Sequence, residues 1–319
     1  MMRYFVGIDL GGTNIKGGIA DENGNVLVKN SFPTEAEKGA EHVAENIVAL
    51  VTALIKASGL KKEDIAGVGA AIPGMIDVKR GVVVYSNNLV WKDVPIRKMI
   101  EDAVSLPVVI GNDANVAALG EAAFGAAKEY EDSVTVTLGT GVGSGIIIGK
   151  KIFPGHDGFG AEIGHTVLCY GGEQCTCGLK GCFEAYASAT ALNRDTKRAM
   201  EKHPESLLWK AANGNIAKGS GKLAFELRDK DPAAREVVES YLDHLAAGLI
   251  NIANVFRPEV ILLGGGVCAQ GENLTRPLQA RMDAGIYGGA LGSTVKVQIA
   301  KLGNDAGFLG AVALAKSEL

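Results

Sequence analysis

The stretch Val134–Ile148, VTVTLGTGVGSGIII, decides the fold, because it repeats the first hairpin of the chain at a constant spacing. Both copies read as a strand, a glycine-rich turn and a second strand, and each opens a β-then-α half of the sequence. The matching residues are Val6, Ile8, Leu10, Gly11, Gly17 and Ile19, which align with Val134, Val136, Leu138, Gly139, Gly145 and Ile147. An internal duplication of this kind predicts two lobes of similar α/β fold that each present one hairpin.

The first hairpin turn reads Asp9-Leu10-Gly11-Gly12-Thr13-Asn14 and lies between two β-prone segments. Rossmann and Walker glycine loops lead into helices, so this turn belongs to neither class. Its backbone N–H groups and the Thr13 hydroxyl could hold phosphate, with a cation close to Asp9. The alternative is an ordinary hairpin whose glycine pair supplies positive φ. With Gly139, Thr140, Gly141 and Gly143 in the second copy, two facing turns predict a nucleotide cleft.

A second candidate site follows the buried-type strand that ends at Ile110. The sequence continues Gly111-Asn112-Asp113-Ala114-Asn115, and residues 116–124 have helical character. Asp113 could cap that helix, as aspartate often does. It could also place a carboxylate in the crevice where α/β sheets bind ligands.

Three cysteines and one histidine predict a metal site between Glu162 and Glu184. The spacing Cys175-x-Cys177-x₄-Cys182, preceded by His165, supplies the ligands of a tetrahedral structural zinc. It lacks the C-x-x-C spacing of thioredoxin-type redox sites, and Cys169 is the competing ligand. Because four protein ligands fill the zinc, both glutamates are available for other binding, although surface carboxylates are the alternative.

The remaining C-terminal half alternates helical and strand patterns. Helical periodicity runs through 233–256, after shorter helices near 187–200, 205–213 and 220–228. The strand Val260–Leu263 leads into three glycines, of which Gly265 could let the backbone lie against a flat ring such as adenine. The alternative is a helix-start turn. A strand at 295–299 and a helix from residue 305 close the chain.

Composition narrows the class of protein. The 319 residues are 47% hydrophobic and 21% charged, which is typical of a globular chain. A net charge of −4 and the lack of a Lys/Arg run argue against a nucleic-acid partner. No apolar stretch approaches the ~18 residues that span a bilayer, and the N-terminus does not read as a signal peptide. We therefore expect a cytoplasmic protein with no membrane partner.

These motifs resemble those of the ROK sugar kinases, a group that also contains sugar-responsive repressors and belongs to the actin-like, ribonuclease-H-like ATPase superfamily. The carrying motifs run from the first strand toward the C-terminus, and the spacing looks most similar to bacterial glucokinases. They are Asp9-Leu10-Gly11-Gly12-Thr13, Asn112-Asp113-Ala114-Asn115, Leu138-Gly139-Thr140-Gly141-Val142-Gly143, Glu162-Ile163-Gly164-His165 and Cys175–Glu184. Two departures are Ser144, where a further glycine is common, and Gly160-Ala161 in place of Ala-Gly.

The resemblance implies a duplicated two-lobe fold with a cleft between the lobes. Residues 1–115, joined by the closing helix 305–319, would form the small lobe, and residues 116–304 the large lobe. It also implies an ATP-dependent kinase acting on the 6-hydroxyl of glucose, with Mg²⁺, a structural Zn²⁺ and a homodimeric or homotetrameric assembly.

The resemblance assigns roles residue by residue. Asp113 would be the general base, and sugar contacts would come from Gly74, Asn87, Asn112, Asp113, Glu162, His165 and Glu184. Zinc would be held by His165, Cys175, Cys177 and Cys182. ATP and magnesium would contact Asp9, Gly11, Gly12, Thr13, Asn14, Gly139, Thr140, Gly141, Gly143 and Gly265.

Three alternatives stay open at this point. The substrate could be fructose, mannose, allose or an N-acetylhexosamine, and polyphosphate could replace ATP as the donor. A sugar-sensing regulator is less favoured, because only three residues precede the first strand and Asp113 is present.

Overall fold

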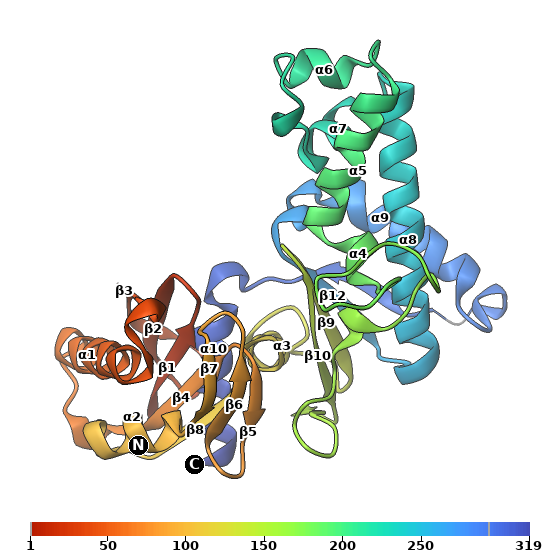
Figure 1. The fold of residues 1–319 in the computed structure, drawn as a ribbon. Coiled ribbons are helices and arrows are strands. Elements are labelled where there is room, and N and C mark those ends of the chain that lie inside the picture. Colours follow the sequence, from red (N-terminus) through yellow and green to blue (C-terminus); the bar gives the residue numbers. More distant parts are fainter. Residues whose placement is uncertain (1, 293) are drawn as a thin grey trace. The chain divides into compact units, whose positions relative to one another are not determined.

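The computed structural model describes residues 2–292 and 294–319 and divides into two compact units (Figure 1). Unit 1 contains the residues up to Ser133, Gly145–Ala161 and Ala300–Leu319. Unit 2 contains Val134–Ser144 and Glu162–Ile299. The expected lobe boundary after residue 115 differs from this division, because it falls within a helix of unit 1.

A five-stranded sheet forms the centre of unit 1, in the order β3-β2-β1-β4-β8. The chain enters through an antiparallel meander in which Ile8 pairs with Gly17, and β4 and β8 then add in parallel beside β1. The strands are β1 (Tyr4–Leu10), β2 (Asn14–Asp21), β3 (Val26–Pro33), β4 (Ile65–Ile72) and β8 (Val108–Asn112). Because β1, β4 and β8 are parallel, their carboxyl ends meet at one edge of the sheet.

Two pairs of helices complete unit 1. Helices α1 (Ala40–Ser58) and α2 (Ile96–Val104) contribute apolar side chains such as Ile47 and Ile100 to the main core. Helices α3 (Asp113–Phe124) and α10 (Ala306–Glu318) pack against each other, and α10 also contacts β1 and β4. The approach of α10 is very close, because a Cβ on Gly69 would lie 1.9 Å from the Ala311 carbonyl oxygen. Small residues are therefore required at this interface.

A three-stranded sheet, β5-β6-β7, follows β4 and was not predicted. Its strands are β5 (Met75–Asp77), β6 (Val82–Ser86) and β7 (Trp91–Val94). The sequence of residues 73–94 does not predict a sheet, because the strands are short and lack clear alternation. The sheet matters for the site because it carries Asn87 in the turn between β6 and β7.

The second five-stranded sheet repeats the order of the first, as β11-β10-β9-β12-β13. An initial strand is again flanked by its hairpin partner on one side and by a later strand on the other. The strands are β9 (Ser133–Leu138), β10 (Val142–Ile148), β11 (Lys151–Ile152), β12 (Val260–Gly264) and β13 (Lys296–Ile299). The duplication expected from the two hairpins is therefore confirmed, and with it the α/β fold class.

Helices make up most of unit 2 outside that sheet. They are α4 (Glu184–Ala187), α5 (Ala189–Lys202), α6 (Leu207–Ala211), α7 (Gly221–Leu227), α8 (Pro232–Phe256) and α9 (Glu272–Gly285). Helix α8 begins where the Asp231 side chain accepts the Ala234 N–H and Pro232 occupies the first turn. Helix α9 was not predicted, because Pro277 lies inside it. Short 3₁₀ turns include Ile163–His165 and Gly266–Gln270.

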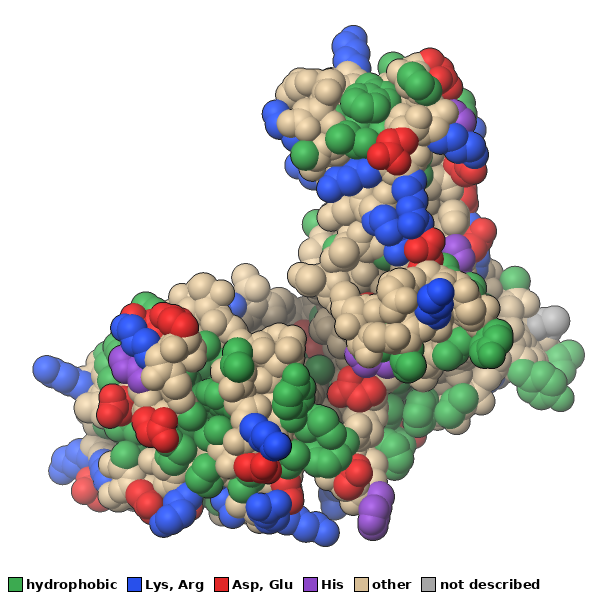
Figure 2. All heavy atoms as spheres, viewed as in Figure 1, with side chains coloured by type: hydrophobic (Ala, Val, Ile, Leu, Met, Phe, Trp, Pro, Cys, Tyr) green, Lys and Arg blue, Asp and Glu red, His purple; other side chains and the backbone are tan. Residues whose placement is uncertain are grey.

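Charged side chains of both signs share the surface. On the face shown in Figure 2, acidic and basic side chains are interspersed. Among the described residues, no helix combines the length and apolar character needed to cross a membrane.

Candidate functional site

Asp9 lies near the carboxyl end of β1, at the edge of the first sheet. Its carboxyl group is pressed against α10, since a Cβ on Gly307 would lie 2.4 Å from the Asp9 Cγ. Burial raises the pKa of Asp9 to about 6, against the lowering effect of Lys16, and the nearby Asp113 carboxylate adds to the rise. Two carboxyl groups of unit 1 therefore lie close enough to interact, which suits a cation beside them.

Asn112, not Asp113, caps helix α3. The Asn112 Oδ1 accepts the Asn115 N–H at 3.1 Å, and its Nδ2 donates to the Gly74 carbonyl oxygen at 3.1 Å. The Asp113 carboxylate accepts the N–H of its own neighbour Ala114, at 2.9 Å. The alternative interpretation of Asp113 as the helix cap is therefore wrong. Burial raises the pKa of Asp113 above its ordinary value.

Gly74 lies between β4 and β5 and packs against β6, the strand that precedes the turn with Asn87. Its φ of 122° requires glycine, and so does the space around it, because a Cβ there would lie 2.3 Å from the Tyr85 carbonyl oxygen. Asn87 is exposed, and its Oδ1 accepts the Tyr85 hydroxyl at 3.4 Å. The neighbouring Asn88 carbonyl lies 3.9 Å from the Cβ position of Gly12. Gly74, Asn87, Asn112 and the first hairpin turn therefore meet within unit 1.

The first hairpin turn is held so that two N–H groups stay unengaged. Gly11 N–H donates to the Asn14 carbonyl at 3.0 Å, and Thr34 bonds the turn at the Gly11 and Thr13 carbonyls, at 2.6 and 2.9 Å. Within the described residues, Gly12 N–H and Thr13 N–H have no hydrogen-bond partner. Neither glycine has positive φ. The glycine pair therefore does not supply positive φ, and two unengaged N–H groups suit an anion.

The second hairpin turn, in unit 2, is built in the same way. Gly139 N–H donates to the Gly141 carbonyl at 3.0 Å, and Val142 N–H donates to Glu184 Oε2 at 2.9 Å. As in the first turn, the glycines at 139, 141 and 143 do not have positive φ. The Glu184 side chain is thus a partner of this hairpin, a contact that the sequence did not predict.

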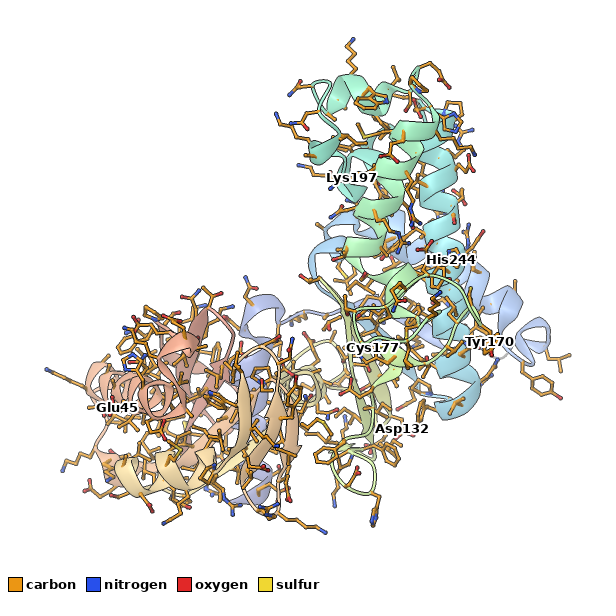
Figure 3. The ribbon with its side chains drawn as sticks, in the orientation of Figure 1. Glu45, Asp132, Tyr170, Cys177, Lys197 and His244 are labelled. Carbon is orange, nitrogen blue, oxygen red and sulfur yellow. The ribbon has the colours of Figure 1, made fainter. Side chains whose placement is uncertain are left out.

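The four predicted zinc ligands converge in unit 2. One ligand atom from each of His165, Cys175, Cys177 and Cys182 lies within 4.8 Å of all the others. The His165 Nδ1 to Cys175 Sγ distance is 3.8 Å, and Cys177 Sγ to Cys182 Sγ is 3.7 Å. Ligands about 2.3 Å from a tetrahedral zinc are separated by about 3.8 Å. The residues present therefore fit zinc. Figure 3 labels one of them, Cys177.

The raised pKa of one cysteine in this cluster also favours a bound cation. Burial raises the pKa of the Cys175 thiol to about 12, so a thiolate here needs a positive charge beside it. Cys169, the competing ligand, lies outside the group of metal-binding side chains found among the described residues. It instead packs near Gly181, where a Cβ would lie 1.9 Å from the Cys169 carbonyl oxygen.

Backbone contacts hold the histidine and cysteine segments together. Phe183 N–H donates to the Thr166 carbonyl at 2.8 Å, and Val167 bridges to Cys182. Glu162 is exposed and directly precedes the 3₁₀ turn that carries His165. Ser144, the first departure from the family pattern, accepts the Ile163 N–H at 3.2 Å and so anchors this turn.

The second departure leaves a strained residue. Ala161 has a φ of 67°, in the left-handed region that glycine adopts more easily. The left-handed conformation of this alanine therefore carries a cost in stability.

Gly265 follows β12 with a φ of 90°, and a Cβ at this position would lie 2.4 Å from the Leu138 carbonyl oxygen. A 3₁₀ turn starts at Gly266, as the helix-start alternative requires. A cavity of about 120 Å³ adjoins that turn and is lined by Val267, Phe225, Lys222 and Leu192 among others. The 3₁₀ turn and the cavity lie next to each other, so the presence of the turn does not exclude a bound ring.

Several supporting residues could not be found from the sequence. Thr34 and Gly307 have no motif, since their contacts come from residues distant along the chain. The predicted residues fall into one group in each unit. Unit 1 holds Asp9, Gly11, Gly12, Thr13, Asn14, Gly74, Asn87, Asn112 and Asp113, and unit 2 holds Gly139, Thr140, Gly141, Gly143, Glu162, His165, Cys175, Cys177, Cys182, Glu184 and Gly265.

The chain belongs to the ROK family, whose family model matches residues 5–318. It is 35% identical to a glucokinase of Halalkalibacterium halodurans over 99% of this chain and 96% of that protein. A glucokinase of Streptomyces coelicolor is 36% identical, with 99% and 98% covered. The crystal structure of a ROK family glucokinase from Streptomyces griseus, in complex with glucose and AMPPNP, is 36% identical. It has a TM-score of 0.80 and covers 98% of this chain and 99% of that one.

A regulator also matches, with less identity. The xylose repressor of Bacillus subtilis is 28% identical over 96% of this chain, which corresponds to 75% of the repressor.

Proposed function

We propose that this protein is an ATP-dependent glucokinase that phosphorylates the 6-hydroxyl of glucose. The observation that carries the proposal is the start of α3, where Asn112 takes the capping role and leaves a partly buried Asp113 carboxylate available. Full-length similarity to glucokinases at 35–36% identity supports the same reaction and substrate.

We assign sugar contacts to two sets of residues, one within each unit. In unit 1 these are Asn112, Asp113, Gly74 and Asn87, which the contacts around Gly74 bring together. In unit 2 they are Glu162, His165 and Glu184. Carboxylate and amide groups suit this role, because they accept or donate hydrogen bonds to sugar hydroxyls.

The nucleotide is assigned to the two hairpin turns. Their unengaged N–H groups would bind phosphate oxygens, and Asp9 would face the magnesium ion. The 120 Å³ cavity beside Gly266 is the proposed place of the adenine ring, next to Gly265. Magnesium, when bound, would neutralise charge on the transferring phosphoryl group.

The reaction places few chemical demands on the protein. The sugar O6 bonds to the γ-phosphorus, the bond from that phosphorus to the bridging oxygen of ADP breaks, and the hydroxyl proton passes to Asp113. A carboxylate within hydrogen-bond reach suffices, because the proton moves late. Burial raises the pKa of Asp113, which makes it a better proton acceptor than an exposed aspartate.

We assign zinc a structural role at His165, Cys175, Cys177 and Cys182. With four protein ligands no coordination position is left for water or substrate, so zinc chemistry is confined to holding the loop. The loop then fixes the segments that carry His165 and Glu184 relative to each other.

An assay of phosphoryl transfer across glucose, mannose, fructose, allose and N-acetylhexosamines tests the proposal, with ATP and polyphosphate as donors. We expect the highest kcat/KM with glucose and ATP. A different preferred sugar or donor would reassign the substrate within the class. Absence of turnover with every pair, together with sugar binding, would favour the regulator instead. Sedimentation would test the expected homodimer or homotetramer, and fractionation the expected cytoplasmic location.

A further inference from the structure

The segment Glu184–Thr190, directly after the last cysteine of the zinc motif, contacts the second hairpin turn at three points. Ala189 N–H donates to the Gly139 carbonyl at 2.9 Å. The Thr190 hydroxyl donates to the Thr140 carbonyl at 2.8 Å. On the other side, Val142 N–H donates to Glu184 Oε2 at 2.9 Å. This short segment therefore forms hydrogen bonds to two carbonyl groups and to one N–H group of the turn.

The contact with Glu184 depends on the absence of a side chain at residue 141. A Cβ on Gly141 would lie 2.2 Å from Glu184 Oε2. Gly141 does not have positive φ, so backbone conformation alone does not require glycine there. Glycine at this position lets the carboxylate approach the turn, and a side chain there would displace it.

The same contacts decide which groups of the turn are available. Gly139 N–H is used by the Gly141 carbonyl, and Val142 N–H by Glu184. Thr140 N–H and Gly141 N–H lie between them and have no hydrogen-bond partner in the portion of the chain that the structure describes. Two consecutive unengaged N–H groups in a rigid turn form a favourable anion site.

Glu184 also reaches back to the metal loop. Its Oε1 accepts the Thr176 hydroxyl at 2.9 Å, and Thr176 lies between the ligands Cys175 and Cys177. The carboxylate thus joins the loop that zinc would order to the turn that would hold phosphate.

We propose that Glu184 and Thr190 are positioning residues of the nucleotide site, which hold the second hairpin turn so that Thr140 N–H and Gly141 N–H face the phosphates. This inference rests on the proposed kinase function, and it adds a nucleotide-positioning role to a segment assigned to sugar. Preorganised N–H donors raise affinity because no ordering cost is paid on binding.

The variant Thr190→Val tests this role, because it removes the hydroxyl while keeping the shape of the side chain. We expect the dissociation constant of a non-hydrolysable MgATP analogue to rise about fivefold, the size of one neutral hydrogen bond. The KM for ATP should rise similarly. The glucose dissociation constant, the zinc content and Tm should stay unchanged, and Thr190→Ser should restore nucleotide affinity.

Thr52→Val is the matched control. Thr52 is also exposed, and its hydroxyl donates to the Val48 carbonyl at 2.8 Å, within α1 of unit 1. If Thr190→Val and Thr52→Val bind the analogue as tightly as wild type, the positioning role is overturned while the kinase function stands. Wild-type protein that binds no nucleotide would overturn both proposals.

A second variant tests the link to the metal loop. Thr176→Val should weaken binding of the analogue by a few-fold with one zinc still bound per chain. Unchanged nucleotide affinity in this variant would show that the zinc loop does not help to position the hairpin turn.

Discussion

Asn112 and Asp113 divide two tasks at the start of α3: Asn112 caps the helix at 3.1 Å from the Asn115 N–H, and Asp113 keeps its carboxylate for other chemistry. The same asparagine bonds Gly74, so the cap also fixes the turn after β4. One residue therefore places the proposed base relative to the proposed sugar loop.

The partly buried position of Asp113 predicts that activity is lost at a higher pH than for an ordinary aspartate base. Burial raises its pKa, and the base must be ionised to accept a proton. We expect kcat/KM for glucose to fall as pH decreases through a pKa above the ordinary value of about 3.9 for aspartate. A pH–rate profile measured down to the limit of folding checks this. Constant kcat/KM down to pH ~4 would contradict it.

Asp9 predicts a pH-dependent effect on stability. Burial raises its folded-state pKa to about 6, so its ionised form destabilises the unliganded protein. The cost is full above pH 6 and vanishes as pH falls toward the unfolded value near 4. Asp9→Asn should therefore raise the free energy of unfolding at pH 7.5 by up to about 3 kcal/mol, and by about half as much at pH 5.

Urea unfolding without magnesium or nucleotide, at both pH values, measures this difference. Asp102→Asn is the control, because Asp102 is exposed and paired with Lys98. An Asp9→Asn protein less stable than wild type at pH 7.5 would show that the Asp9 carboxylate stabilises the fold through its contacts and does not destabilise it through burial.

Ala161 predicts a stabilising substitution. Its φ of 67° is unfavourable for alanine, so Ala161→Gly should raise the free energy of unfolding by about 0.5–1 kcal/mol after the entropic cost of glycine. Ala49→Gly, at an exposed position in the middle of α1, should instead lower it by about 1 kcal/mol. Chemical denaturation of both variants measures these changes in the free energy of unfolding. An Ala161→Gly protein less stable than wild type would show that the Ala161 backbone is not strained.

The four-ligand cluster predicts one zinc per chain. Cys177→Ser should abolish zinc binding and lower both Tm and glucose affinity, because the loop loses its cross-link. Cys169→Ser, outside the cluster, should keep the metal. Elemental analysis with calorimetry of glucose binding separates the cases. Zinc loss in Cys169→Ser, or normal glucose affinity after zinc removal, would refute the assigned role.

The sequence predicted those features that depend on residues close together in the chain. The Gly-rich turns, the Cys-x-Cys-x₄-Cys spacing and the periodicity of α8 each lie within one short stretch, so the duplication and the His/Cys cluster could be predicted directly. Contacts between distant segments were not predictable. The Asn112–Gly74 bond, the Glu184–Val142 bond and the Gly307–Asp9 packing depend on tertiary structure that no local pattern reports. The short strands β5 and β7 were missed for lack of periodicity.

The most direct test of the account is the Asp113→Asn variant, with turnover and glucose binding measured on the same preparation. Asparagine keeps the size and the Ala114 contact but cannot accept the proton. We expect kcat to fall by about 10²–10⁴, with the glucose dissociation constant within about threefold of wild type. Near-normal kcat in Asp113→Asn would contradict the central claim that Asp113 is the general base.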